Sequence, residues 1–306
     1  MKINKKHLLP IILWAVVIVL AIYSVTLFFG SPNYLEVIFI DVGQGDATFI
    51  RTSSGTTILV DAGGNWRQTS NVGRDIVGTY LIRRGIRSVD KAIISHYHED
   101  HAQGFIELAE LMNIRTFLMP DSEFRPPLYY ELVATAENMG ADIYYISRGN
   151  IIHLDNNTIF EVLFPLAYGE TYHSGITFFR GGTPEPNNDS LIMRLVYGDT
   201  TFLFTGDIER RGELALVGEP RLNSDVLHVA HHGSRTSTTQ EFLDTVSPDF
   251  AVISAGLNNQ FNHPHPDVMA RLDNIPNITI YRTDLHGTIT FLVCRINGIV
   301  ERRTTR

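Results

Sequence analysis

The stretch Ser95–Gly104, SHYHEDHAQG, puts three histidines and two acidic residues within six positions, directly after the apolar run KAIIS (Lys91–Ser95). An apolar run of this kind is consistent with a buried strand. Polar side chains at the end of a buried strand lose contact with water, which is costly unless they find other partners. The stretch therefore predicts a binding site at a strand end, built by side chains between His96 and His101.

The spacing divides these side chains into two groups. His96 and His98 are two residues apart, and side chains with that spacing on an extended backbone point to the same side. Both can therefore reach one cation. Asp100 and His101 follow where the chain must turn into the next helix, so they leave in another direction and can reach a second cation. Imidazole and carboxylate ligands suit Zn²⁺, Mn²⁺ or iron.

Polar clusters follow three further predicted strands: VDAGG after Thr56–Val60, TGD after Phe202–Phe204, and AHHGS after Val226–Val229. Strand ends bring distant parts of a chain to one rim, where sites are commonly built. Asp207, in TGD, is then the natural bridge between two cations, and His231 or His232 completes the set. Spacing does not decide between these two histidines. His231 is preferred as the ligand and His232 as a residue near the substrate.

The chain from about residue 35 onward has a mixed order of strands, hairpins and helices, without an internal repeat or a low-complexity tract. Its periodicity predicts, among other elements, helices at 104–112 and 127–140, a hairpin over 189–207 and a last strand at 287–296. Two sheets packed face to face, with helices outside, would bury this many strands. The predicted fold class is therefore mixed α/β.

Composition excludes several kinds of protein. The 306 residues carry a formal net charge of −8, so the chain is not a general polyanion binder, and contact with nucleic acid would need a local basic patch or bound cations. Cys294 is the single cysteine, which excludes a disulfide within the chain and a cysteine-rich zinc site. Its place in the apolar run TITFLVC predicts a buried side chain.

The N-terminus predicts a membrane segment. The basic start MKINKKH precedes an uncharged run from Leu8 to Phe29, long enough to cross a bilayer as a helix. The lysines would stay in the cytoplasm, so the rest of the chain would be exported. A cleavable signal peptide is the alternative, but the bulky end YSVTLFFGSPN lacks a small-x-small site. We predict an uncleaved anchor in residues 1–30 and one domain over 31–306.

The motif HYHEDH (residues 96–101) matches the HxHxDH signature of the metallo-β-lactamase superfamily. Further motifs resemble, in order, the metallo-hydrolase domain of ComEC-type competence proteins; these are FIDVGQGDATFI, ILVDAGG, NNDSLIMRL, FLFTGD, VLHVAHHGS and NHPHP. Bacterial surface phosphorylcholine esterases share much of this pattern. The resemblance runs from about Leu35 to Phe291. It implies an αββα sandwich with a dinuclear metal site between the sheet edges.

The resemblance also implies the ligands, which are His96, His98, Asp100, His101, Asp207 and one histidine of the 231–232 pair. The cofactor implied is two divalent metal ions, with Zn²⁺ preferred and Mn²⁺ as the alternative. The superfamily usually has one more histidine before the bridging aspartate, but this chain has NND at that position. Either Asn188 or Asp189 then substitutes for it, or the first metal keeps an open face.

Three aspartates are candidates for supporting roles around the metals. Asp41 and Asp46 lie in DVGQGD, and Asp61 lies in VDAGG. Each is placed to hydrogen-bond a ligand histidine or the neighbouring backbone, and the sequence leaves both interpretations open.

The candidates for catalysis are Asp100, His232 and His263. His263, in NHPHP, follows another predicted strand end, where it would contact the substrate or protonate a leaving group. Arg235, shortly after HHGS, is the first candidate for a phosphate contact.

A pair of divalent cations activates water at neutral pH and stabilises the charge of a phosphodiester in its transition state. With the resemblance, this predicts a membrane-anchored, extracytoplasmic phosphodiesterase that acts on DNA. The alternative substrate is a cell-wall phosphodiester with phosphorylcholine, for which Tyr168, Tyr172, Phe178 and Phe179 offer aromatic faces. The third possibility is a non-catalytic binding module. Protein partners are not predicted, and no channel role is carried over from ComEC.

Overall fold

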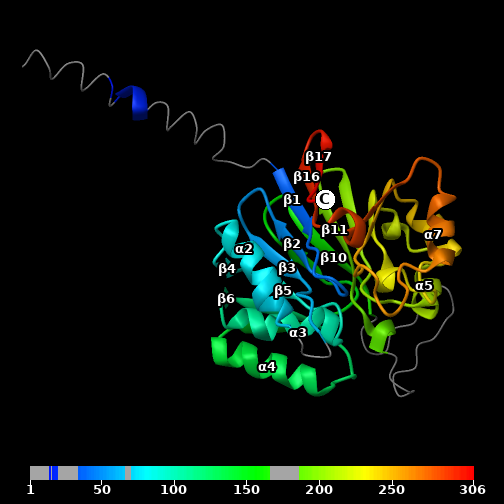
Figure 1. Cartoon of the computed structure of the whole chain (residues 1–306), viewed down its shortest axis with the longest axis horizontal. Helices are drawn as coiled ribbons and strands as arrows, with labels where there is room; N and C mark the ends of the chain where they lie inside the picture. Colours follow the sequence, from blue (N-terminus) through cyan, green and yellow to red (C-terminus); the bar gives the residue numbers. More distant parts are fainter. Residues whose placement is uncertain (1–13, 15, 20–33, 66–69, 166–185) are drawn as a thin grey trace, which may run out of the picture.

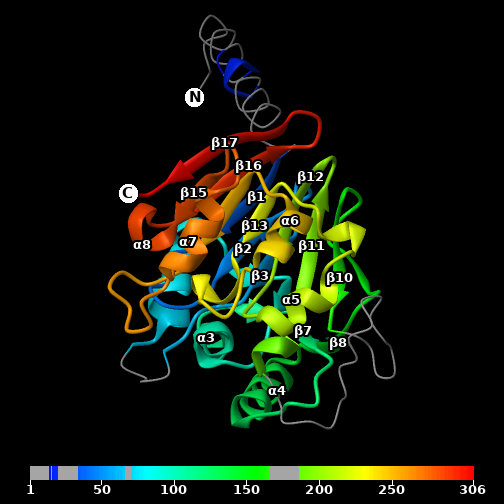
Figure 2. The same cartoon turned by 90° about the vertical axis from the view of Figure 1, so that its right-hand side faces the viewer.

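The computed structural model describes residues 14, 16–19, 34–65, 70–165 and 186–306. Two large sheets lie face to face, and helices cover the outer face of each (Figures 1 and 2). The arrangement is the αββα sandwich that the sequence predicts.

Within the described residues, the first sheet has eight strands in the order β17-β16-β1-β2-β3-β5-β7-β8. Their bounds are β1 Tyr34–Phe39, β2 Thr48–Arg51, β3 Thr57–Val60, β5 Lys91–Ile93, β7 Thr116–Pro120, β8 Asp142–Ile146, β16 Ile289–Cys294 and β17 Gly298–Thr304. The strands from β3 to β8 pair in parallel, and the others pair antiparallel. β1 pairs with β16, so segments from both ends of the described fold join one sheet.

The second sheet has seven described strands in the order β15-β14-β13-β12-β11-β10-β9. Their bounds are β9 Ile151–His153, β10 Thr158–Phe164, β11 Ile192–Tyr197, β12 Thr200–Phe204, β13 Val226–His228, β14 Phe250–Ile253 and β15 Thr279–Arg282. β12 to β15 run in parallel. The predicted hairpin is confirmed, since β11 and β12 pair antiparallel around a turn at Gly198–Asp199. β4 (Ser88–Val89) and β6 (Asn113–Ile114) form a separate small ladder.

Helices pack outside both sheets. The first sheet is covered by η1 Val72–Gly78, α2 Thr79–Arg83, α3 Glu99–Ala109 and α4 Pro127–Met139. The second is covered by α5 Arg210–Leu216, α6 Gln240–Val246 and α7 Pro266–Asp273. The shorter helical segments are η2 Pro186–Asp189, η3 Pro220–Leu222, η4 Ala230–Gly233 and α8 Thr283–His286.

Alternation of apolar side chains along the strands builds three core layers. In β1, Val37 and Phe39 pack between the sheets, while Ile38 packs against the helices of the first sheet. In β12, Phe204 packs between the sheets and Leu203 against the outer helices of the second sheet. Successive side chains of a strand point to opposite faces, so strands that are apolar on both faces lie between two layers.

One element begins earlier than the sequence indicates. The helix predicted from residue 104 begins at Glu99 as α3. Its first turn is polar, which hides it from an apolar pattern, but Glu99 and Asp100 are favourable beside the positive end of the helix dipole. His98 precedes the helix in extended conformation, with φ −86° and ψ 152°. The segment 96–101, which the sequence predicts to bind metal, is therefore the strand-to-helix junction itself.

The expected burial of Cys294 is wrong. Its side chain is partly exposed at the end of β16, because the chain turns there into β17, an edge strand that the sequence analysis missed. β17 carries mostly polar and exposed side chains, so it lacks the apolar signal of an interior strand.

The predicted membrane segment, Leu8–Phe29, lies mostly outside the described residues. Within it, Trp14 and residues 16–19 are described and are helical and exposed. Among the helices in the described ranges, none combines the length and the apolar character that crossing a bilayer requires.

Candidate metal centre

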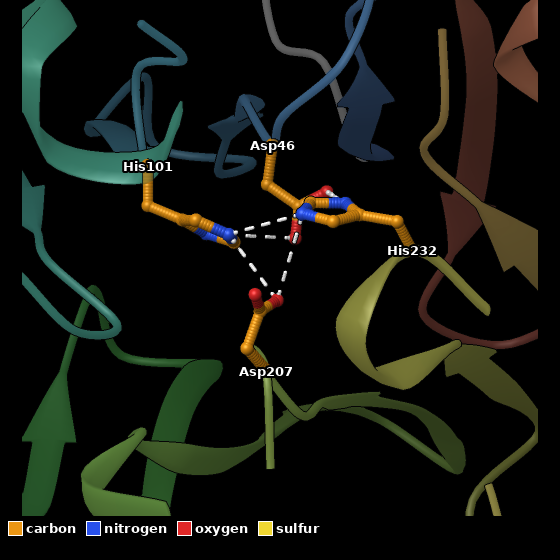
Figure 3. Close-up of side chains that lie close together, drawn as sticks. All are labelled: Asp46, His101, Asp207 and His232. Atoms are coloured by element: carbon orange, nitrogen blue, oxygen red, sulfur yellow. Dashed lines mark hydrogen bonds and ion pairs between the residues drawn. The ribbon is translucent and has the colours of Figure 1, made fainter. Parts of the chain in front are cut away.

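Segments that follow strands of both sheets bring polar side chains to one centre. The loop between β1 and β2 supplies Asp46, β3 leads to Asp61, and β5 leads to the stretch 96–101. From the second sheet, β12 leads to Asp207 and β13 leads to the pair 231–232. Figure 3 shows four of these side chains directed toward one another. The prediction that these strand ends meet at one rim is confirmed.

Asp61 fixes the protons of two histidines. Its Oδ2 accepts hydrogen bonds from His101 Nδ1 at 2.9 Å and from Ser95 Oγ at 2.6 Å. Because a carboxylate only accepts, the proton of His101 is on Nδ1. The Ser95 hydroxyl gives its proton to Asp61, so it accepts from His96 Nδ1 at 3.0 Å. Both histidines therefore present an unprotonated Nε2 when they are neutral.

A cluster forms around His101 and His232. His232 Nδ1 donates to the carbonyl of Ser254 at 3.0 Å, so its Nε2 is also unprotonated in the neutral ring. That Nε2 lies 3.3 Å from His101 Nε2 and 3.3 Å from Asp100 Oδ2. Asp207 Oδ1 lies 3.2 Å from His101 Nε2 and 3.7 Å from His232 Nε2 (Figure 3). Lone pairs this close repel one another unless a cation or a proton lies among them. We call Asp100, His101, Asp207 and His232 the second cluster.

The first cluster consists of His96, His98 and Asp207, whose ligand atoms lie within 4.8 Å of one another. His96 Nε2 lies 3.0 Å from His98 Nδ1 and 3.8 Å from Asp207 Oδ2. His231 Nε2 lies 3.6 Å from the same Oδ2 and has a side chain that is 21% exposed. His231 therefore leaves the first cluster partly open to solvent.

Asp207 stands between the two clusters. Its Oδ2 faces the first cluster and its Oδ1 faces the second. Ser190 Oγ accepts a hydrogen bond from the backbone N–H of Asp207 at 3.1 Å, which holds the corner after β12. Asp207 Oδ1 is buried, and none of the described residues donates a hydrogen bond to it. A buried carboxylate oxygen needs a compensating partner, and a divalent cation on either side of Asp207 fits this donor set.

The pKa values of His101, His232 and Asp207 also indicate that the site favours positive charge. Burial lowers the pKa of His101 and His232, but Asp207 and its neighbouring carboxylates outweigh burial and raise both pKa values well above the ordinary range. Burial raises the pKa of Asp207, but His101, His232 and His231 outweigh it and hold that pKa well below its usual value. Without a metal ion, the second cluster therefore retains protons, which a bound cation would displace.

The backbone at the histidine pair is strained. His231 and His232 have φ values of 51° and 55°, in the left-handed region that non-glycine residues seldom adopt. Such strain persists where the surroundings hold it, often at functional sites. Here the turn sends the two rings to opposite oxygens of Asp207. His232, at 2% exposure, is the buried member in the second cluster, and His231 is the member beside the first.

Asp46 supports the second cluster from behind. Its Oδ1 lies 3.4 Å from both His228 Nε2 and His232 Nδ1, and its Oδ2 lies 3.8 Å from His101 Nδ1. Burial raises the pKa of Asp46, but His228 and His232 outweigh burial and lower it well below its usual value. His228 was not predicted to be part of the site. Its signal was a histidine within the otherwise apolar strand β13.

The Gly45–Asp46 backbone packs directly on the metal-ligand motif. The N–H of Asp46 donates to the carbonyl of Asp100 at 3.1 Å. A Cβ on Gly45 would lie 2.3 Å from that carbonyl oxygen, and Gly45 has φ +127°. Only glycine fits this close approach without strain, which explains the GQGD pattern.

A cavity of ≈ 750 Å³ opens on both clusters, and its lining includes His98, Asp100 and His231. The ring of His263 lies nearby, with its centroid 5.7 Å from that of His231 and 6.4 Å from that of His232. Burial, followed by the charges of these two histidines, lowers the pKa of His263 to about 4. His263 is therefore neutral at neutral pH and suited to contact a substrate.

The candidate substitutes for the missing histidine bond elsewhere. Asn188 Oδ1 accepts hydrogen bonds from the backbone N–H groups of Glu209 at 3.1 Å and Gly212 at 3.2 Å. Asp189 Oδ2 accepts from Ser122 Oγ at 2.6 Å. Neither residue belongs to the two clusters found among the described residues. Through Asn188, this segment anchors the loop that carries Asp207.

Two further candidates lie away from the clusters. Asp41 accepts a hydrogen bond from the backbone N–H of Gly43 at 3.2 Å and pairs with Arg306 at 2.7 Å, so it holds local backbone rather than a ligand. The side chain of Arg235 is 75% exposed and lies 3.6 Å from Asp267. Arg235 is not among the described residues that line the cavity.

The chain is similar in sequence to curated proteins that are named for competence and recombination. It is 31% identical to ComE operon protein 3 of Bacillus subtilis over 84% of this chain and 33% of that protein. It is 28% identical to competence protein ComA of Neisseria gonorrhoeae, over 95% of this chain and 37% of that protein. It is 31% identical to recombination protein 2 of Haemophilus influenzae, over 93% of this chain and 32% of that protein. The chain thus spans about a third of the length of these curated relatives.

The fold is also found in solved structures. CmlA, a diiron beta-hydroxylase from Streptomyces venezuelae, superposes with a TM-score of 0.51 and 16% identity, over 84% of this chain and 53% of that one. At this identity, the likeness concerns the fold alone. Residues 40–256 match the family model described as metallo-beta-lactamase superfamily. The chain belongs to the metallo-β-lactamase superfamily, as a metal-dependent hydrolase similar to the ComEC-type competence proteins.

Proposed function

We propose that this chain is a membrane-anchored, extracytoplasmic phosphodiesterase that uses two divalent metal ions and cleaves DNA. The observation that carries the chemistry is the position of Asp207, whose two oxygens face two clusters of imidazole nitrogens. Similarity to proteins named for competence and recombination, over 84% to 95% of this chain, supports DNA as the substrate.

The proposed ligands of the first metal are His96, His98, His231 and Asp207. Those of the second metal are Asp100, His101, His232 and the same Asp207. Two divalent cations held there would make water a better nucleophile and offset the negative charge of a phosphodiester. Imidazole and carboxylate ligands suit zinc, with manganese as the alternative.

The other residues position these groups. Asp61 and Ser95 hold the protons of His101 and His96 on Nδ1, so that Nε2 of each neutral ring can bind a metal ion. Asp100, whose side chain is 29% exposed, is available to both the second cluster and the cavity. His263 is neutral at neutral pH, so it would not serve as an acid in the free protein. It would contact the substrate by accepting a hydrogen bond from it or by donating one to it.

The test combines metal content with activity. Mass spectrometry of the native protein should find two metal ions per chain, and plasmid and oligonucleotide assays should show hydrolysis. In His98→Ala, metal content should fall toward one, and kcat/KM should fall by more than about 100-fold, since even the loss of a partner behind a metal ligand costs 10- to 100-fold. Asp207→Ala should lose both metals. His153→Ala, an exposed histidine in β9, is the matched control and should change neither.

Other outcomes would support the alternatives. Hydrolysis of p-nitrophenylphosphorylcholine without cleavage of any nucleic acid would favour the cell-wall phosphodiesterase; the aromatic residues that suggest it, Tyr168, Tyr172, Phe178 and Phe179, lie outside the described residues. Less than one metal per chain, with Asp207→Ala unchanged in every assay, would point to a binding module. The anchor in residues 1–30 is tested by membrane fractionation and by protease accessibility of the hydrolase domain in spheroplasts.

A further inference from the structure

We propose that Phe261 stacks on a nucleobase beside the phosphodiester that is cleaved, and so selects nucleic acid over other phosphodiesters. This inference rests on the proposed phosphodiesterase function and names the part of the substrate that the cavity beside the metal clusters would hold. The inference is based on a row of three stacked rings, His232, His263 and Phe261, which leads from the second cluster to the lining of that cavity.

The cavity has two kinds of wall. Its volume of ≈ 750 Å³ exceeds what a single phosphate group needs and is within the range of small-molecule sites. Metal-cluster residues such as His98 and His231 line one part. Another part is lined by residues 258–261, in the loop between β14 and α7 (Figure 2, the orange loop beside α7). A substrate held by its phosphate at the clusters would therefore meet this loop with a neighbouring group.

Three rings form a nearly parallel series. Phe261 stacks on His263 with centroids 5.6 Å apart and an interplanar angle of 27°. His263 stacks on His232 with centroids 6.4 Å apart and an angle of 29°. Phe261 is nevertheless 49% exposed, so part of its ring remains available to a ligand. Bases stack readily on aromatic side chains of this kind, whatever their sequence, because every base has a π-face.

The loop that carries Phe261 is held in place before any substrate binds. Asn259 Oδ1 accepts hydrogen bonds from the backbone N–H groups of Phe261 at 3.1 Å and His263 at 3.0 Å. Asn259 Nδ2 donates to the carbonyls of Gly256 at 2.9 Å and His263 at 2.5 Å. One side chain thus ties the two ends of the loop together. A preorganised platform loses less entropy when a ligand stacks on it.

The polar neighbours of Phe261 favour a base over a quaternary ammonium group. Asn65, Asn258 and Gln260 line the same cavity. Side-chain amides offer both hydrogen-bond donors and acceptors, which match the polar edges of nucleobases. A quaternary ammonium group has no hydrogen-bonding atoms, so side-chain amides add nothing to its recognition by an aromatic face. An aromatic platform beside amides is therefore better suited to a nucleobase.

The test compares an oligothymidylate with an abasic strand of the same length and charge. Binding of each, as a phosphorothioate labelled with fluorescein at its far end, is measured by anisotropy on the metal-loaded full chain in detergent. Phe261→Ala should weaken binding of the oligothymidylate by about 5- to 150-fold, the range expected for one stacked base. It should leave binding of the abasic strand unchanged. Phe261→Trp should keep the preference.

The matched control is Leu257→Ala. Leu257 lies in the same loop and is 63% exposed, but it is not among the described residues that line the cavity. It should bind both strands as the wild type does. With cleavable oligonucleotides, Phe261→Ala should raise KM by a similar factor and change kcat little, because the ring contacts the base and not the reacting atoms.

The outcomes separate this inference from the proposed function. Equal binding of both strands by the wild type, or equal loss in Phe261→Ala, would overturn the stacking role while leaving any phosphodiesterase activity intact. Base-dependent binding without hydrolysis would uphold the stacking role and refute the enzymatic proposal. If Phe261→Ala impaired hydrolysis of glycerophosphocholine and not of oligonucleotides, the ring would face a choline group, and the inference would fail.

Discussion

Among single residues, Asp61 controls both metal clusters at once. It accepts from His101 directly and from His96 through Ser95. Asp61→Asn should lower zinc affinity by about 10- to 100-fold, because Asp61 accepts hydrogen bonds at both oxygens and an amide accepts at only one. The NH2 group then faces a donor, and the ring protons are no longer held on Nδ1. Asp61 has φ 55°, which asparagine tolerates, so the fold should persist. Competition with a chromophoric chelator measures the affinity.

The control for this prediction is Asp41→Asn. Asp41 bonds Gly43 and Arg306 instead of a histidine, so its removal should leave zinc affinity within about twofold, as expected for a residue without a metal-side contact. Equal losses in the two variants would mean that Asp61 acts through general destabilisation.

The sequence predicted those site residues that form a local motif, and it did not predict those that are joined only by the fold. The spacing of His96, His98 and His101 is local, so it indicated a metal site before any fold was known. Other contacts join residues that are far apart in the sequence. Ser95 hydrogen-bonds Asp61, 34 positions away, and Ser254 hydrogen-bonds His228, 26 positions away. Neither carries a local pattern. The direction of His231 and His232 depended on a left-handed turn that two adjacent histidines do not predict.

Among the elements, α5 holds the loop that follows the histidine pair. Glu213, in α5, is fully buried and accepts hydrogen bonds from the backbone N–H groups of Thr238 and Thr239. Arg271, in α7, donates to the carbonyls of Thr238 at 2.7 Å and Ser237 at 3.0 Å. Burial raises the pKa of Glu213 to about 7 and outweighs these backbone bonds.

This raised pKa predicts a pH dependence of stability. A carboxyl that is more basic folded than unfolded binds more protons in the folded state, so its contribution is complete below pH 4.5 and is lost as pH rises toward 7. The free energy of unfolding of the wild type relative to Glu213→Gln should therefore fall by up to about 3 kcal/mol between pH 4.5 and 8. Urea titrations of both proteins across this range measure it. A difference that did not vary with pH would show that Glu213 ionises normally.

Elements were predictable where they bury an apolar face. The hairpin of β11 and β12 and the helix ending at Gly140 follow from periodicity and turn residues. The start of α3 at Glu99 did not, because functional polar residues occupy its first turn. β17 was missed because it is an exposed edge strand. The start of α3 and the strand β17 were both missed because neither buries an apolar face.

In the whole molecule, the metal centre joins the two sheets. The segment 96–101 follows β5 of the first sheet, whereas Asp207 and His232 follow β12 and β13 of the second. Without cations, buried carboxylates and crowded imidazole nitrogens from both sheets face one another. We therefore expect metal to stabilise the sandwich as a unit, beyond its role in chemistry.

Zinc at 100 times its dissociation constant should stabilise the folded protein by about 2.7 kcal/mol through mass action for each site that it occupies. For a fold of this size, that raises Tm by about 5–10 °C per site. EDTA should reverse the shift. Asp207→Ala should show almost no metal-dependent shift, whereas His153→Ala, exposed in β9, should show the full one. Scanning calorimetry with and without metal measures this shift. Because the readout is stability, the prediction does not depend on which substrate the enzyme cleaves. An unchanged Tm with two metals bound would contradict this prediction and would mean that the unfolded chain binds the metals as tightly as the folded one.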